Sequence, residues 1–180
     1  MKFSFAVVAS LFFAAQAVAL PAELKDAEAS NAAHGCPNGN RATPLYRAFN
    51  PSVTDHFYTT NAVEVRNARG YQQEGQAGRV FSRQESSTIP FYRLYNPSNA
   101  NHFYTTNQWE ADNAANTLGY NREGVAGYVF GAHICGSVPL YRLYQAGSVD
   151  HFYTTNQWEA DNAANTLGYT REGVAGYILQ

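Results

Sequence analysis

Charge is scarce in this chain of 180 residues, which has 12 Lys and Arg, 14 Asp and Glu and a net charge of -2. Nucleic acid favours a strongly basic surface, and anionic lipid favours a polybasic cluster. The sequence offers neither, so we expect no nucleic-acid partner. Long apolar runs are also lacking, since no segment approaches the roughly 20 apolar residues of a spanning helix, and we expect no membrane partner.

Cysteine and known catalytic signatures are equally sparse. Cys36 and Cys135 are the only cysteines, without C-x-x-C spacing, so in an exported protein we expect them to form one disulfide bond. No Ser-His-Asp set, zinc-helix signature or glycine-rich phosphate loop is present. We therefore expect no cofactor and no metal, and a binding protein is favoured over an enzyme, although the sequence leaves catalysis open.

The first residues have the features of an export signal. Lys2 precedes an apolar run from Phe3 to Ala15, and Ala17-Val18-Ala19 is a small-residue cleavage pattern. We interpret residues 1–19 as a signal peptide, residues 20–35 as a flexible leader or pro-segment and residues 36–180 as a single domain. The product is predicted to be secreted and extracellular.

Three segments of that domain repeat the same motifs in the same order, and we place the repeats at residues 44–89, 90–138 and 139–180. Each contains a Pro-(Leu/Phe)-Tyr-Arg motif, an (Asp/Asn)-His-Phe-Tyr-Thr-Thr motif and a Glu-Gly-x-Ala-Gly block that begins at Glu74, Glu123 or Glu172. Residues 102–128 and 151–177 differ only at Asn121 against Thr170. Repeats 2 and 3 must therefore build nearly the same local structure.

Within a repeat, the motifs predict strand, strand, helix and strand. The two aromatic segments around an Asn-Pro-Ser turn favour a hairpin. Asn107 followed by Glu110 is a capping box, and Ala111, Ala114, Ala115 and Leu118 form an apolar helical stripe that ends at Gly119. The segment after it returns as a strand, in which Gly124 and Gly127 indicate a bend or a close backbone approach.

One such unit is too small to bury its apolar face alone, so the repeats must pack together. The fold class we expect is α+β and β-dominated, with three pseudo-symmetric β-β-α-β repeats in one compact closed domain. A disulfide from the start of repeat 1 to the junction of repeats 2 and 3 favours closure over an open solenoid. A β-trefoil-like fold is the alternative, although its repeats do not normally carry a helix. We expect a monomer.

The repeated pattern from about Pro44 to Gln180 resembles a family of aromatic-rich repeat domains of uncharacterised function. Such domains occur in secreted fungal and bacterial proteins, sometimes appended to cell-wall-degrading enzymes. The resemblance implies export and attachment to glycan or cell wall, and it supplies no catalytic residues. Repeat 1 departs from the pattern, with three residues fewer between His56 and Glu74 and with Arg79 in place of Tyr128 and Tyr177.

The helix of repeats 2 and 3 carries the predicted ligand site. On the face opposite the alanine stripe lies an indole beside carboxylate and amide groups, which is typical of a sugar platform. The predicted ligand-binding residues are Trp109, Asp112, Asn116, Trp158, Asp161 and Asn165. Repeat 1 has Val63 and Arg66 at the first two of these positions. Packing of the indoles against a neighbouring repeat is the structural alternative.

Three further arrangements are considered. His56, His102 and His151 would form a zinc site only if they converged. Asp55-His56 and Asp150-His151 are adjacent in a strand and point to opposite faces, so they form no dyad. The repeated glutamates, beside Arg122 and Arg171, favour ion pairs over a glycosidase carboxylate pair.

The sequence thus predicts a lectin-like, carbohydrate- or cell-wall-binding protein whose partner is a glycan. A secreted glycan- or peptide-degrading hydrolase and a structural wall or matrix protein without a small ligand are the alternatives.

Overall fold

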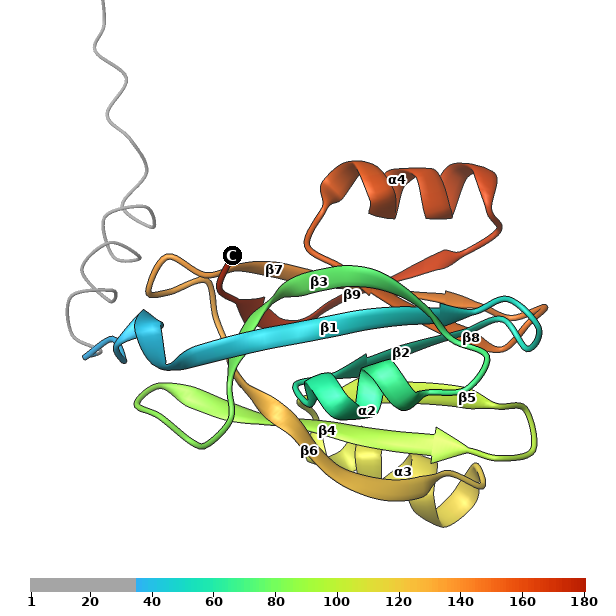
Figure 1. The fold of residues 1–180 in the computed structure, drawn as a ribbon, viewed down its shortest axis with the longest axis horizontal. Helices are drawn as coiled ribbons and strands as arrows, with labels where there is room; N and C mark the ends of the chain where they lie inside the picture. Colours follow the sequence, from blue (N-terminus) through green and yellow to red (C-terminus); the bar gives the residue numbers. More distant parts are fainter. Residues whose placement is uncertain (1–34) are drawn as a thin grey trace, which may run out of the picture.

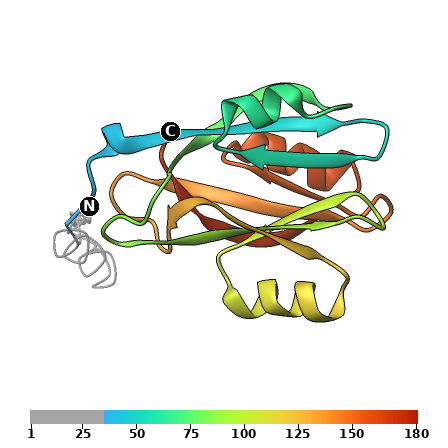
Figure 2. The same cartoon turned by 60° about the horizontal axis from the view of Figure 1, so that its bottom comes forward.

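The computed structural model describes residues 35–180, so the predicted signal peptide and nearly all of the predicted leader lie outside the described residues. The described chain contains nine strands, three α-helices and the short 3-10 helix η1 (Gly39–Arg41). None of these helices is long and apolar enough to cross a membrane. Figures 1 and 2 show the strands packed at the centre with the three α-helices spread around the outside.

The order strand, strand, helix, strand occurs three times, and we call each occurrence a unit. Unit 1 contains β1 (Ala42–Asn50), β2 (Asp55–Thr59), α2 (Ala62–Asn67) and β3 (Gln72–Phe81). Unit 2 contains β4 (Thr88–Asn96), β5 (Asn101–Thr105), α3 (Gln108–Thr117) and β6 (Asn121–Phe130). Unit 3 contains β7 (Val138–Gln145), β8 (Asp150–Thr154), α4 (Gln157–Thr166) and β9 (Thr170–Ile178). Repeat 1, which lacks three residues between His56 and Glu74, also has the shorter helix. Helix α2 has 6 residues, whereas α3 and α4 have 10.

All nine strands belong to one open antiparallel sheet. In each unit the first strand lies between the second and third, as in β2-β1-β3. The units join through their third strands, with Phe81 opposite Tyr128 and Phe130 opposite Tyr177. An isolated antiparallel bridge also joins Arg79 to Leu179, so the third strands of units 1 and 3 touch as well.

The close approach of these third strands explains the last glycine of the Glu-Gly-x-Ala-Gly block. A Cβ atom on Gly127 would lie 2.6 Å from Cγ2 of Val80, closer than carbon atoms can pack. Gly124 in the same block has a φ of 105°, a conformation that favours glycine. Both glycine roles expected from the sequence, a bend and a close approach, are therefore present.

Helix α3 begins and ends as predicted, because Gly119, with a φ of 78°, follows the C-cap residue Leu118. Asn107 is the N-cap of α3, and its side chain accepts hydrogen bonds from the backbone N–H groups of Trp109 and Glu110. The reciprocal bond of a capping box is absent, because Thr105 Oγ1 accepts from the Asn107 N–H instead. The helix ends at Thr117, so Leu118 leaves the apolar stripe and is 56% exposed, contrary to the core position predicted for it.

The main core lies where the second strands of the three units meet. Tyr58, Tyr104 and Tyr153 are fully buried there, with ring centroids 5.4 to 5.5 Å apart in edge-to-face contacts. Each hydroxyl donates to the backbone C=O of the next tyrosine and accepts from the N–H of that same residue, at 2.7 to 2.8 Å. The three phenols thus form a closed ring of six hydrogen bonds.

The predicted disulfide bond is confirmed. Cys36 and Cys135 are bonded, and 99 residues of sequence separate them. Cys135 packs against a small cluster of Ala42, Phe81 and Phe130. The bond therefore fastens the segment before unit 1 to the connection between units 2 and 3.

Candidate functional site

Three pockets lie where the helix of one unit faces the strands of another. The Trp158 pocket, at the junction of units 3 and 1, has a volume of about 240 Å³. Its lining residues are Arg47, His56, Glu74, Phe152, Trp158, Glu159, Asn162, Ala163, Leu167 and Tyr169. Pockets for drug-sized ligands occupy about 300 to 1,000 Å³, so this one suits a group the size of a single sugar ring.

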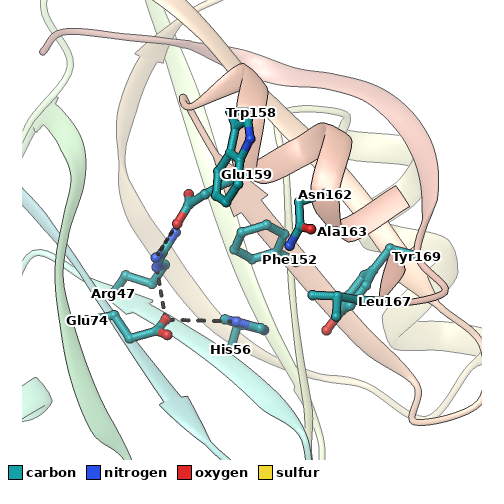
Figure 3. Close-up of a pocket in the computed structure, with 10 residues that line it drawn as sticks. All are labelled: Arg47, His56, Glu74, Phe152, Trp158, Glu159, Asn162, Ala163, Leu167 and Tyr169. Atoms are coloured by element: carbon teal, nitrogen blue, oxygen red, sulfur yellow. Dashed lines mark hydrogen bonds and ion pairs between the residues drawn. The ribbon is translucent and has the colours of Figure 1, made fainter. Parts of the chain in front are cut away.

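The walls of the Trp158 pocket differ in chemistry, as Figure 3 shows. Helix α4 contributes the indole of Trp158 and the amide of Asn162, which lie one helical turn apart on the same face. The ring of Phe152 lies between that wall and the charged wall, where Arg47 and Glu74 come from unit 1. The pocket therefore combines an aromatic platform with hydrogen-bonding groups.

The Trp109 pocket repeats this arrangement at the junction of units 2 and 3, with a volume of about 250 Å³. Its lining residues are Phe103, Trp109, Glu110, Asn113, Ala114, Leu118, Tyr120, Arg142, His151 and Glu172. The third pocket, which we call the Glu64 pocket, lies between units 1 and 2 and is lined by Phe57, Glu64, Asn67, Ala68, Tyr71, Arg93, His102 and Glu123. It has no indole, because Val63 occupies the tryptophan position of the shorter helix.

A half-buried arginine connects the two units at each pocket. The Arg47 guanidinium donates to both carboxylate oxygens of Glu159 at 3.0 and 2.9 Å, and its Nε lies 3.0 Å from Glu74 Oε2 in an ion pair. Arg93 and Arg142 hold the corresponding glutamates in the same way. The ion pairs expected for the repeated glutamates are therefore present, but their partners are these arginines, whereas Arg122 and Arg171 pair with Asp112 and Asp161.

These contacts fix the charges of the pocket walls. The hydrogen bond from Arg47 lowers the pKa of Glu159, and it outweighs burial, which acts in the opposite direction. Burial would lower the pKa of Arg47, but the hydrogen bond to Glu159 and nearby negative groups raise it above its ordinary value. Glu159 retains about 31% of its side-chain exposure, so its carboxylate remains accessible to a ligand while it holds Arg47.

Each pocket histidine is paired with the unit next to it. His56 Nδ1 lies 2.6 Å from Asp150 Oδ2, and His102 Nδ1 lies 2.6 Å from Asp55 Oδ2. Both aspartates are fully buried and also accept the backbone N–H of the same histidine. Adjacent Asp and His residues thus do not bond each other, as expected, but the sequence did not reveal that they pair between units.

The third histidine has a different partner. His151 faces Asn101, whose Nδ2 lies 2.9 Å from His151 Nδ1 and whose Oδ1 accepts the His151 backbone N–H at 3.2 Å. Burial, followed by the positive charge of Arg142, lowers the pKa of His151 to about 3, although Asp150 and Glu110 act in the opposite direction. His151 is therefore neutral at physiological pH.

The neutral, buried His151 makes stability depend on acid. The unfolded chain protonates this imidazole near its ordinary pKa of about 6.5, whereas the folded chain does so only near pH 3. The unfolded state therefore binds more protons between these values, and the free energy of unfolding should fall as the pH is lowered from about 6.5 towards 3. Asn101→Asp places a carboxylate beside Nδ1, as in the other two pairs, and should reduce this loss.

Urea denaturation at pH 7 and pH 4.5 of wild type and Asn101→Asp tests this expectation. Groups elsewhere that titrate in acid contribute equally to both proteins, so the comparison reports on the pair formed by position 101 and His151. An equal loss of stability in the two proteins would contradict a buried neutral imidazole at this position.

The predicted ligand residues occupy three environments. Trp109 and Trp158 are each 72% exposed, so neither indole packs between units. Asp112 and Asp161 lie outside the pocket linings in ion pairs with Arg122 and Arg171. The exposed amides of Asn116 and Asn165 also lie outside these linings.

The pockets contain groups that are not among the six predicted ligand residues. Asn113 and Asn162 take the position beside the indole, and the arginines and histidines of the opposite wall come from another unit. The sequence spacing could have identified both asparagines, because each lies four residues after a tryptophan and therefore on the same helical face. Nothing in the spacing indicated which unit would supply the opposite wall.

The three histidines do not converge, because the tyrosine ring occupies the place where the second strands meet. Within residues 35–180, no cluster of three or more His, Cys, Asp or Glu side chains is arranged to hold a metal ion. The chemistry available in the pockets is therefore that of their aromatic rings, amides, ion-paired carboxylates and imidazoles.

Comparison with known proteins gives one match. The family model described as "Domain of unknown function (DUF5648)" matches residues 36–179. Neither the curated proteins nor the solved structures gave a match. The matched segment covers all three units and both cysteines, so this chain belongs to the DUF5648 family.

Proposed function

We propose that this protein is a secreted carbohydrate-binding protein that uses the Trp158 and Trp109 pockets to bind a glycan or cell-wall polysaccharide. The observation that carries the proposal is the exposed indole at the edge of each pocket, beside an amide and an ion-paired carboxylate. An exposed indole presents a large flat apolar surface, which a sugar ring can cover on binding. Export, which the signal-like N-terminus favours, places the protein where such polymers occur.

The chemistry of the pockets suits a sugar. The C–H face of a pyranose ring packs on an indole, while hydroxyl groups bond to the amide of Asn162 and to the accessible oxygens of Glu74 and Glu159. Arg47 holds both carboxylates in place before a ligand arrives, which reduces the entropy lost on binding.

We further propose that the three units close into a pseudo-threefold domain. Cyclic contacts support closure, because the tyrosine ring, the Arg–Glu pairs and the His pairs each link unit 1 to 3, unit 2 to 1 and unit 3 to 2. The bridge between Arg79 and Leu179 supports it further. Closure would present the pockets around one molecule, so that a polymer could engage two at once.

Avidity makes this arrangement effective even if each pocket is weak. Two linked sites on a polymer bind more tightly than either alone, by about 10² to 10⁴ in typical cases. The Glu64 pocket lacks an indole and serves as an internal contrast, because it retains the arginine, glutamates and histidine.

The test is a polysaccharide pull-down and glycan array with Trp109→Ala, Trp158→Ala and the double variant. Each single change should weaken binding of a polymer about tenfold or more, because it removes one stacking platform and the gain from avidity. The double change should abolish binding. Val63→Ala, at the equivalent position of the Glu64 pocket, is the matched control and should leave binding unchanged.

Retention of full binding by the double variant would refute the indole platforms. All three variants change exposed side chains, so their thermal unfolding should match wild type and exclude loss of folding as the cause.

A hydrolase acting on glycan or peptide is the second candidate, and one observation favours it. His56 is held by buried Asp150, and its Nε2 lies 3.9 Å from Glu74 Oε2 in the pocket, an arrangement that suits a general base. The glutamates proposed for catalysis, Glu123 and Glu172, are however held by Arg93 and Arg142. Turnover on a substrate panel that disappears in Glu172→Gln or His56→Gln would favour this candidate.

The exposure of Trp109 and Trp158 weighs against the third candidate, a matrix protein without a small ligand, which requires those indoles to be buried between units.

A further inference from the structure

The two indole-bearing pockets differ in one buried residue that faces the histidine. In the Trp158 pocket that residue is Asp150, and in the Trp109 pocket it is Asn101. The remaining parts correspond one to one: tryptophan, asparagine, arginine, two glutamates and histidine. Of the residues that hydrogen-bond the histidine ring, this one differs, and the ring that packs on the histidine differs as well, Phe49 on His56 and Tyr144 on His151.

Asp150 fixes the hydrogen position on His56. Its carboxylate can only accept hydrogen bonds, and it lies 2.6 Å from Nδ1, so Nδ1 must donate. Tyr169 donates its hydroxyl to the same oxygen at 2.5 Å, which agrees with an ionised acceptor. In the neutral imidazole the other ring nitrogen, Nε2, is then an acceptor.

Asn101 fixes the opposite arrangement on His151. Its Oδ1 accepts the backbone N–H of His151, which orients the amide so that Nδ2 is directed towards Nδ1 at 2.9 Å and towards the hydroxyl of Tyr120 at 2.6 Å. Both hydrogens of the amide are thereby used, and the contact of Nδ1 with Nδ2 at 2.9 Å is shorter than its contact with Oδ1 at 3.4 Å, so we assign Nδ1 as the acceptor. The hydrogen of the neutral ring then lies on Nε2, which faces Glu172 Oε2 at 3.7 Å.

The two pockets also differ in charge. The ion pairs of the Trp158 pocket contain three carboxylates, those of Glu74 and Glu159 on Arg47 and that of Asp150 on His56. Those of the Trp109 pocket contain only two, the carboxylates of Glu110 and Glu172 on Arg142, because Asn101 is neutral. The Trp158 pocket thus has one more negative charge, buried behind its histidine, and His56 Nε2 is one more acceptor for a ligand.

From these contacts we infer that Asn101 and Asp150 determine specificity, so that the Trp158 pocket takes a sugar bearing an ammonium group and the Trp109 pocket takes a sugar bearing a neutral carbonyl substituent. The ligand classes rest on the proposed carbohydrate function, whereas the opposite histidine tautomers do not. An ammonium group supplies hydrogens to the carboxylates and to His56 Nε2. A carbonyl oxygen accepts the hydrogen of His151 Nε2.

The tautomers are measured first, without any ligand, by two-bond ¹⁵N–¹H correlation spectra of the imidazoles at pH 8. His56 should carry its hydrogen on Nδ1 and His151 on Nε2. Asn101→Asp should move the hydrogen of His151 to Nδ1, and Asp150→Asn should move that of His56 to Nε2. His102, paired with Asp55, is the unchanged internal control. A hydrogen on Nδ1 of His151 in wild type, or on both nitrogens of His56, would overturn the inference.

The ligand classes are measured by calorimetry with glucosamine oligomers and their N-acetylated counterparts. Trp109→Ala leaves the Trp158 pocket, and Trp158→Ala leaves the Trp109 pocket. The first protein should prefer the ammonium form by about tenfold or more, the effect of one charge-assisted hydrogen bond, and the second should prefer the acetylated form by about fivefold, the effect of one neutral hydrogen bond. Asn101→Asp in the Trp158→Ala background should shift preference towards the ammonium form.

The outcomes separate the two proposals. If wild type binds neither oligomer nor any glycan, the carbohydrate function fails while the tautomer result stands or falls by its own spectra. If both single-pocket variants bind with the same preference, the carbohydrate function survives and the assignment of specificity to Asn101 and Asp150 is wrong.

Discussion

Tyr104→Phe is expected to lower the free energy of unfolding by about 2 to 4 kcal/mol, although it removes a single oxygen atom. The Tyr104 hydroxyl donates to the C=O of Tyr58 and accepts from its N–H, both at 2.8 Å. Both partners are backbone groups in a fully buried strand, so the variant leaves a donor and an acceptor without water or protein partners. Each such group costs about 1 to 3 kcal/mol.

Urea denaturation of Tyr104→Phe against Tyr46→Phe measures this effect. Tyr46 lies on β1, half-buried, and its hydroxyl makes no hydrogen bond within the described residues, so its replacement should change stability by less than about 0.5 kcal/mol. The corresponding variants of Tyr58 and Tyr153 should cost as much as Tyr104→Phe, because each hydroxyl makes the same two bonds. Similar losses for Tyr46→Phe and Tyr104→Phe would mean that the ring of hydrogen bonds does not stabilise the core.

The elements of the fold were predictable because their signals are local. Asn107 as N-cap, the alanine stripe and the aromatic strand motifs each specify a conformation within about ten residues. The disulfide followed from there being only two cysteines in a chain predicted to be exported. Leu118 was placed wrongly because it is the C-cap residue, whose backbone leaves helical geometry, so helical periodicity no longer sets its exposure.

The site was only partly predictable because it is assembled from two units. The exposed face with Trp109 and Trp158 followed from helical periodicity. Which neighbours of the indole line a pocket depends on the tilt of the helix over the next unit, so Asn113 lies in the pocket and Asp112 pairs with Arg122 outside it. The partners Asp150 of His56 and Asn101 of His151 lie 94 and 50 residues away in the chain, and periodicity within one repeat carries no information about such pairs.

Removing the disulfide is expected to have the largest effect on stability. Replacing both Cys36 and Cys135 with Ala should lower the free energy of unfolding by up to about 4 to 5 kcal/mol, the loop-closure entropy of a loop of roughly 100 residues. The bond closes a loop of the unfolded chain that contains all of units 1 and 2, and the sequence has no further cysteines for a second disulfide. Wild type treated with a reductant should lose the same amount.

The m-value, the slope of the free energy of unfolding against urea concentration, distinguishes this loop-entropy mechanism from a local packing defect. Without the bond the unfolded chain is more expanded and exposes more surface, so the m-value should rise together with the loss of stability. A packing defect around Cys135, in the cluster with Phe81 and Phe130, would lower stability and leave the m-value unchanged.

A second double variant, Cys36→Ala with Cys135→Ser, also separates loop entropy from packing. It lacks the bond, as the double alanine variant does, but it has a different side chain at position 135. The two double variants should therefore be equally stable if the bond acts on the unfolded chain. The stabilities of the two double variants and of reduced wild type can be compared with that of oxidised wild type. If all three lie within about 1 kcal/mol of it, contacts between the units already restrict the chain as much as the bond does.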